Sequence, residues 1–472
     1  MEQQRAQSSR EYIRLLTEVL KKLANCAAVE ACKLCTIIDL SLPRENRFKP
    51  ISCSPDLAQC LVGSFPSLTS LSLYGYDIPC STLASLLSHP QLSLQLQQLD
   101  LTSTIITQPK RPEPGASTLT NLFHASRLKQ LSLLINTLAG EGSNNLPNLQ
   151  PLSQHLTQLC LVQQGYVSRC PEKFIAALQP LAQLQLLTIS DLWYLPDGLP
   201  GLLQGLPQLH TLQLPCAQVR GEEQLDSLLA ATQLTSIHLY SLFGVESPRS
   251  DVPCSWQRLE LTDTIDCSSV AHLPLHSLTH PLVLGRFSIR IGSDICSLVA
   301  AAVHNLTQAR SVPVTVKELW LSMSGACLEA AEQQVELQQL VAVLQALKQC
   351  SWGRVFMSHM TVGAADVLTL APLCQACPQL EFAYGSVTPS LEFWRQLVQL
   401  MPTVTHLTFS DVKGSASAAM YQSLKLMAEQ PWARWLDICI SRPPRSDRLP
   451  ACWQASPLSQ PGKIRVWFKT LV

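Results

Sequence analysis

One spacing of apolar residues recurs along the 472-residue chain and constrains its fold more than any other feature. In each copy, an apolar residue is followed by a second one three positions later and by a third one two positions after that. The first eight clear copies begin 22 to 32 residues apart, a period typical of repeat proteins. Clear copies begin at Leu68, Leu96, Leu128, Leu156, Leu184, Leu209, Leu234, Trp256, Val316, Trp352, Val404 and Ala433, and weaker ones at Cys35, Thr279 and Leu380.

Each repeat is expected to supply one short strand, and many are expected to supply one helix as well. The second and third apolar positions of a copy alternate, so they point to one face of a strand. Apolar residues at three- and four-residue steps predict helices at 82–89, 172–184, 222–231, 294–306, 328–350, 363–374, 391–401 and 415–429. One strand and one helix cannot bury their own apolar faces, whereas stacked copies can. The sequence therefore predicts an α/β solenoid with parallel strands on a concave face and helices on a convex face.

A longer pattern, L-x-x-L-x-L-x-x-N-x-L, is complete at Leu128, Leu131, Leu133, Asn136 and Leu138. Through these residues the chain resembles the leucine-rich-repeat family over residues 35–440. The resemblance implies a curved solenoid that binds another protein on its concave face.

Most copies depart from the family pattern, because they lack the Asn whose side chain would bond the backbones of neighbouring repeats. Such copies are similar to the irregular intracellular class, the ribonuclease-inhibitor-like or F-box-associated arrays, and they predict uneven curvature. The residues at the Asn position are Tyr76, Thr104, Gln164, Leu192, Ala217, Leu242, Thr264 and Ser324.

Three regions follow from these patterns. Residues 1–35 contain an amphipathic stripe and are expected to form an N-terminal helical cap, which a solenoid needs to cover its first repeat. An F-box-like adaptor module is the alternative there. Residues 36–440 form the solenoid, with an irregular insert at about 266–315 in which alternation at 287–291 suggests an extra strand. Residues 441–472 are read as a proline-rich segment followed by a C-terminal capping strand.

Composition excludes several classes of function. Lys and Arg together number 34, as do Asp and Glu, so no basic excess is available to neutralise nucleic acid. No stretch has 18 successive apolar residues, and the polar N-terminus lacks the apolar core of a signal peptide. We therefore expect a cytoplasmic monomer that does not insert into membranes, with association with the cytoskeleton or a ciliary axoneme as a further option.

The 18 cysteines have irregular spacing and are expected to be reduced thiols in the core. Two CxxC pairs, Cys32/Cys35 and Cys374/Cys377, lie too far apart in sequence to form the usual zinc motif. We also find none of the common nucleophile, phosphate-binding or zinc-protease motifs, and His406 and Asp411 lack a nucleophile beside them. The sequence thus predicts no metal, no cofactor and no enzymatic activity.

The residues that flank the second and third apolar positions of each copy should line the concave face. They are small and mildly polar in the first repeats, but aromatic and charged in the later ones, as at protein interfaces. The weak copy at Leu380 puts Phe382, Tyr384 and Ser386 on this face. The predicted partner-binding residues are Tyr240, Arg258, Glu260, Glu318, Trp320, Arg354, Phe356, Tyr384 and Trp435.

We therefore predict a non-catalytic scaffold that binds a protein partner through shape and hydrogen bonds. Two alternatives remain at this stage. One is a substrate receptor of a ubiquitin ligase, with residues 1–35 as a degenerate adaptor. The other is a structural component of the cytoskeleton or cilium.

Overall fold

The computed structural model describes most of the repeat region and little of the two ends. The described residues are 18, 37–41, 65, 67–74, 77–107, 123, 127–136, 148–167, 172–193, 198–245, 247, 253–291, 295–308, 313–323, 330–347, 350–359, 361–374, 377–383, 386–387, 389–410, 417–431, 436–442, 459–460 and 464–470. The expected N-terminal cap or adaptor, apart from Glu18, lies outside these residues, as do most of the expected proline-rich segment and Cys32/Cys35.

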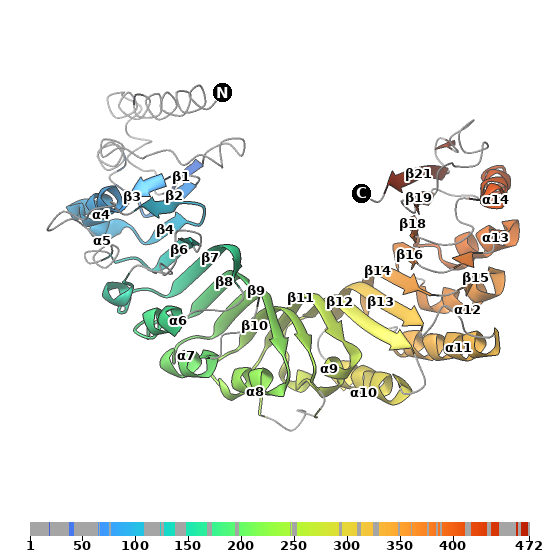
Figure 1. Ribbon diagram of the computed structural model, residues 1–472, viewed down its shortest axis with the longest axis horizontal. Coiled ribbons are helices and arrows are strands. Elements are labelled where there is room, and N and C mark those ends of the chain that lie inside the picture. The colour runs from blue at the N-terminus through green and yellow to red at the C-terminus, as the bar shows by residue number, and fades with distance from the viewer. Residues whose placement is uncertain are drawn as a thin grey trace. The chain divides into compact units, whose positions relative to one another are not determined.

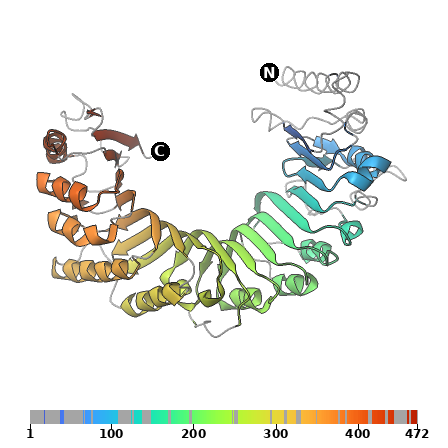
Figure 2. The ribbon, with the colours of Figure 1, turned by 180° about the vertical axis from the view of Figure 1, so that it is seen from behind.

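The chain divides into two compact units. Unit 1 comprises Met1–Val219 and Glu223–Leu239, and unit 2 comprises Arg220–Glu222 and Tyr240–Val472. Within each unit, the strands lie side by side along one face and the helices line the opposite face (Figures 1 and 2). None of the helices among the described residues is long and apolar enough to span a membrane.

The sheet of unit 1 follows chain order. Parallel pairing joins β1 (Ile37–Ser41), β2 (Ser70–Tyr74), β4 (Gln98–Leu101), β6 (Gln130–Asn136), β7 (Gln158–Val167), β8 (Leu186–Leu192) and β9 (Thr211–Arg220), and β9 pairs with β10 (Ser236–Phe243). The register aligns Leu71, Leu99, Leu131, Leu159, Leu187 and Leu212, the second apolar position of each copy. The repeat pattern in the sequence is therefore the pairing register of the sheet.

Between these strands, unit 1 has short helical elements and one small sheet. They are β3 (Asp77–Pro79), which pairs with β5 (Ile105–Thr107), and α4 (Cys80–Ser88), α5 (Pro90–Gln95), η2 (Gln150–Leu152), α6 (Glu172–Leu178), α7 (Leu199–Gly205) and α8 (Glu222–Ala230).

Unit 2 has the same construction, and most of its helices are longer than those of unit 1. Parallel strands run in the order β11 (Arg258–Asp266), β12 (Leu282–Ile291), β13 (Val314–Met323), β14 (Ser351–Ser358), β16 (Gln379–Ala383), β18 (His406–Ser410), β19 (Leu436–Arg442) and β21 (Ile464–Thr470), and β20 (Ser459–Gln460) pairs antiparallel with β21. The remaining elements are α9 (Cys267–His272), η3 (Leu275–Ser277), α10 (Ile295–Gln308), α11 (Ala330–Ala346), α12 (Ala364–Cys374), α13 (Leu391–Leu400), α14 (Ala418–Ala428) and the pair β15 (Thr361–Val362) and β17 (Ser386–Val387).

The core of unit 2 lies between its sheet and its helices. Trp394 of α13 is fully buried, and its ring meets Phe409 of β18 edge to face with centroids 6.5 Å apart. The Trp394 indole N–H donates to the hydroxyl of Ser423 on α14 at 3.0 Å, so its one polar atom is satisfied. Ser390 accepts a hydrogen bond from the Phe393 backbone N–H at 3.0 Å and begins α13 as an N-cap. Burial of each such large apolar side chain stabilises the fold by roughly 1.5–3 kcal/mol.

The region around β12 differs from the expectation of a weak copy plus an extra strand. A single ten-residue strand, β12, contains both the 282–284 and the 287–291 segments. Its Leu284, Phe287 and Ile289 pair with Val316, Leu319 and Leu321 of β13, so these three residues are the actual copy of the repeat.

β12 also lies unusually close to its other neighbour. The β11–β12 register shifts between Leu261 and Thr264, and a Cβ on Gly285 would overlap the Thr262 carbonyl. Glycine is needed there because the two backbones approach so closely.

The register of β16 also corrects the sequence interpretation. Leu380 pairs with Val355 and Phe382 pairs with Met357, so the repeat begins at Cys377, three residues before Leu380. Phe382 is consequently buried in the core, whereas the prediction put it on the concave face. The sheet-face positions of β16 are Gln379, Glu381 and Ala383.

The Asn position of the repeat is filled in different ways. At Leu192, Ala217 and Leu242 the side chain is apolar and buried. At Thr104 the hydroxyl is buried and donates to the Leu73 carbonyl of the neighbouring repeat. Despite these differences, the parallel strands remain aligned on the same apolar positions. The fold is therefore an α/β leucine-rich-repeat solenoid.

Candidate partner-binding surface

Six side chains come together on the open face of the unit 2 sheet. We call them the sheet-face cluster: Arg286, Glu318, Trp320, Arg354, Phe356 and Glu381. The strand register places them in two rows, one with Arg286, Glu318 and Arg354 and the next with Trp320, Phe356 and Glu381. They occupy the alternate positions of each strand, between the apolar residues that point into the core, because side chains alternate between the two faces of a strand.

The aromatic part of the cluster is a stack across three strands. Trp320 and Phe356 are nearly parallel, with planes 15° apart and centroids separated by 4.1 Å. The Arg286 guanidinium carbon lies 4.1 Å from the centroid of the Trp320 ring. Since Arg286 comes from β12 and Phe356 from β14, the strands on either side of β13, they cover opposite faces of the indole. The edge of the Trp320 ring, and not its face, is left for a partner.

Glu318 connects the two rows. One carboxylate oxygen accepts hydrogen bonds from the Trp320 indole N–H at 2.9 Å and, more weakly, from Arg286 Nε at 3.4 Å. The other oxygen lies 3.4 Å from Arg354 Nη1. Burial acts to raise the pKa of the Glu318 carboxyl, but the Trp320 hydrogen bond and the two guanidinium groups outweigh it and lower the pKa. Glu318 is therefore ionised at neutral pH and fixes Trp320, Arg286 and Arg354 together.

Glu381 is the buried charge of the cluster. Its side chain is only 8% exposed. Arg354 donates to one of its oxygens, and the Ser410 hydroxyl donates to the other at 2.6 Å. A buried carboxylate is costly unless it is paired and hydrogen-bonded, and here both conditions are met.

Further ion pairs extend the charged surface along neighbouring strands. Arg286 also lies 3.5 Å from Asp263. Arg258 and Lys317 both approach Glu260, at 3.5 and 3.9 Å. On β18 and β19, His406 lies 3.9 Å from Asp437, a pair that is ionic only when the imidazole is protonated.

The nine predicted residues have different positions in the structure. Glu318, Trp320, Arg354 and Phe356 come together in the cluster. Arg258 and Glu260 form the adjacent pair on β11, while Tyr240 is half-buried on β10. Tyr384 and Trp435 lie outside the described residues.

The repeat pattern in the sequence did not identify two members of the cluster, Arg286 and Glu381. Both lie in repeats for which the wrong apolar triplet was chosen. The triplet Leu284–Phe287–Ile289 would have put Arg286 on the sheet face, and Cys377–Leu380–Phe382 would have put Glu381 there. Both triplets have the required spacing, so the signal was present.

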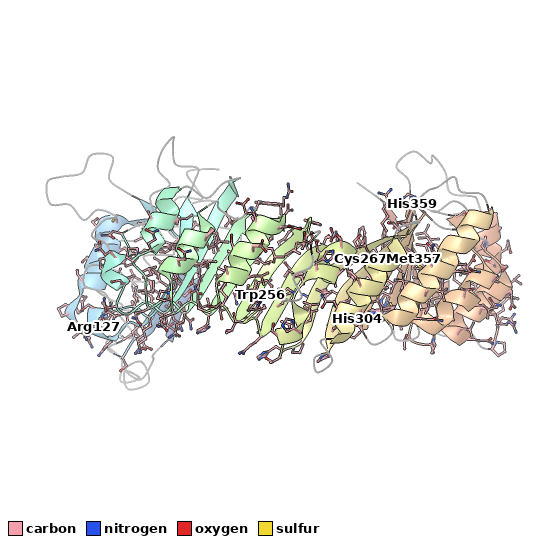
Figure 3. The ribbon with its side chains drawn as sticks, turned by 90° about the horizontal axis from the view of Figure 1, so that it is seen from below. Arg127, Trp256, Cys267, His304, Met357 and His359 are labelled. Atoms are coloured by element: carbon pink, nitrogen blue, oxygen red, sulfur yellow. The ribbon has the colours of Figure 1, made fainter. Side chains whose placement is uncertain are left out.

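The chemistry of the cluster suits binding better than catalysis. General acid–base work favours a pKa near the working pH, whereas Glu318 is held below its ordinary value. Burial raises the pKa of Cys267, at the start of α9 (Figure 3), to about 12, and that of Cys377 to about 11, which keeps these thiols protonated and unreactive. Among the described residues, no group of three or more His, Cys, Asp or Glu side chains is placed to hold a metal ion.

No protein-family model matches the chain, and no curated protein matches it. Among solved structures, it is similar to an internalin from Listeria monocytogenes, with 16% sequence identity, a TM-score of 0.37, and coverage of 84% of this chain and 94% of that one. The repeat fold of this chain is defined by its own strand register.

Proposed function

We propose that this protein is a non-catalytic interaction scaffold that binds a protein partner on the sheet face of unit 2, centred on the sheet-face cluster. The observation that carries the proposal is the stack of Arg286, Trp320 and Phe356, held in place by Glu318. Trp and Arg are enriched among interface residues that contribute most to binding. Side chains that are already fixed lose less conformational entropy when a partner binds.

The test is affinity purification with the full chain, followed by mass spectrometry, using wild type and Trp320→Ala. A partner of this surface should be recovered by wild type and depleted at least about tenfold by Trp320→Ala, the loss typical of an interface residue worth above 1.4 kcal/mol. Trp193→Ala is the matched control, because Trp193 is also a half-buried tryptophan but belongs to unit 1. Equal recovery by all three proteins would overturn the proposal, provided that circular dichroism shows all three folded.

We further propose that the protein is a cytoplasmic monomer of the irregular intracellular repeat class. The nine cysteines whose side chains the structure describes are free thiols, which supports a reducing compartment. Residues 1–35 and 441–472 are proposed to cover the two ends of the repeat array, since exposed terminal repeats would leave apolar surface in water. Deletion of either segment should promote aggregation, as measured by light scattering.

A further inference from the structure

The charges on the unit 2 sheet are arranged by depth as well as by sign. In every ion pair along these strands within the described residues, the cationic side chain is more exposed than its carboxylate partner. The exposed fractions are 56% for Arg258 against 22% for Glu260, and 35% for Arg354 against 8% for Glu381. Glu260, Glu381 and Asp437 thus lie nearer the sheet than their cationic partners, whereas Glu318, at 30%, is nearly as exposed as Arg286 and Arg354.

The helix side of unit 2 shows what an ordinary surface pair looks like. Arg395 and Glu392 of α13 are exposed by 50% and 45%, nearly the same amount. Their carboxylate is as available to a partner as their guanidinium. The large depth differences at Glu260, Glu381 and Asp437 are therefore not shared by this helix pair, whereas the two ion pairs of Glu318 resemble it.

From this arrangement we infer that the partner segment recognised by the unit 2 sheet face is acidic. This inference rests on the proposed function and names the chemistry of its ligand. A docking polypeptide meets the N–H groups of Arg258 and Lys317 before it reaches Glu260, and those of Arg354 before it reaches Glu381. Carboxylates of Asp and Glu match the planar fork of a guanidinium. Basic side chains would have to displace these outer cations to reach the carboxylates beneath.

The same face is poorly suited to nucleic acid, which is the other common polyanion. Single strands are usually held by stacking bases on exposed aromatic faces. Both faces of the Trp320 indole are already covered, by Arg286 and Phe356. The chain has no excess of positive charge, so long-range attraction to a phosphate backbone is weak. Short-range pairing with a few carboxylates does not need such an excess.

The test is selection of a phage-displayed random 12-residue peptide library on the folded full chain. Peptides whose retention is lost with Trp320→Ala are sequenced, and representatives are synthesised. Asp and Glu should be enriched about threefold over the unselected library. Binding of these peptides should weaken about threefold to tenfold for the double variant Arg258→Gln/Lys317→Gln, as expected for the loss of two exposed ion pairs, and should weaken as sodium chloride is raised. The control Arg395→Gln, on α13, should bind like wild type.

The outcomes separate this inference from the proposed function. Trp320-dependent peptides without acidic enrichment, or with Lys and Arg enrichment, would overturn the acidic ligand alone. A fluorescent dT12 oligonucleotide that binds more tightly than the selected peptides and displaces them would overturn it in favour of nucleic acid. If no retained peptide depends on Trp320 and partner capture is also unaffected by Trp320→Ala, the proposed function falls as well.

Discussion

Trp320 and Phe356, on the adjacent strands β13 and β14, stack with ring centroids 4.1 Å apart. We expect these rings to be energetically coupled by about 0.5–1.5 kcal/mol beyond the area that each buries. The measurement is a double-mutant cycle of Trp320→Leu and Phe356→Leu, using the free energy of unfolding in urea. Strictly additive effects of the two substitutions would show that the rings are neighbours without a specific interaction.

Arg354→Ala should destabilise the protein far more than Arg258→Ala. Loss of Arg354 leaves the carboxylate of Glu381 buried without its cation, which costs roughly 2–4 kcal/mol, toward the lower end of the range for buried pairs because Arg354 is partly exposed. Arg258 pairs with the more exposed Glu260, so its loss should cost less than about 1 kcal/mol. The double variant Arg354→Met/Glu381→Leu should recover part of the lost stability, as read from urea-unfolding midpoints.

Glu318 should make stability depend on acid pH. Its pKa is lowered in the folded protein, so its contribution is present above the ordinary Glu pKa of 4.5 and is lost as the pH falls through the lowered value. The melting temperature of wild type should therefore fall more steeply between pH 6 and pH 3 than that of Glu318→Gln. Glu223→Gln, an exposed site in unit 1, is the control and should leave the pH profile unchanged. Identical profiles for all three proteins would contradict the role given to Glu318.

Gly285→Ala should be destabilising by roughly 1–3 kcal/mol, because the added methyl group overlaps the Thr262 carbonyl and forces β11 and β12 apart. Gly201→Ala in α7 is the comparison, since nothing lies within 4 Å of a Cβ at that position. That substitution should stabilise the protein by up to about 1 kcal/mol, the helix propensity difference. A thermal-unfolding series of the two variants distinguishes steric overlap from a general effect of replacing glycine.

Asn305 should be needed for stability even though it begins an Asn-Leu-Thr glycosylation sequence. Its side-chain amide donates to the carbonyls of Val270 and Leu273, at 2.8 and 2.6 Å. These hydrogen bonds give partners to backbone carbonyl groups at the C-terminal end of α9. Asn305→Ala should lower the free energy of unfolding by roughly 1–3 kcal/mol, because these half-buried carbonyls lose their donor. Thr307→Ala removes the same glycosylation sequence while leaving the amide in place, and unfolding in urea should separate the two variants.

The repeat spacing was enough to predict the fold, because the apolar triplets are the same residues that align the strands. It failed where two triplets compete. In β12, Leu282 and Leu284 are buried like Phe287 and Ile289, so alternation alone does not show which pair aligns with Leu319 and Leu321.

The sequence identified only part of the candidate surface, because only the clear triplets show which residues lie on the sheet face. Glu318, Trp320, Arg354 and Phe356 belong to repeats with clear triplets, and the structure brings them together. The guanidinium of Arg286 reaches Trp320 across one strand, while Glu381 is buried between Arg354 and Ser410. Such contacts depend on side-chain conformation, which a spacing pattern does not encode.

Leu192, Ala217 and Leu242 occupy positions where the complete repeat pattern has Asn, and all three are buried. A hydrogen bond between repeats requires one donor and one acceptor at a fixed distance and angle, whereas apolar contact requires only that surface be covered. Repeats joined in the second way are free to differ in length, which matches their spacing of 22 to 32 residues. Insertions between strands should for this reason be tolerated better in this array than in one held by an asparagine ladder, so the chain can acquire new loops without losing its register.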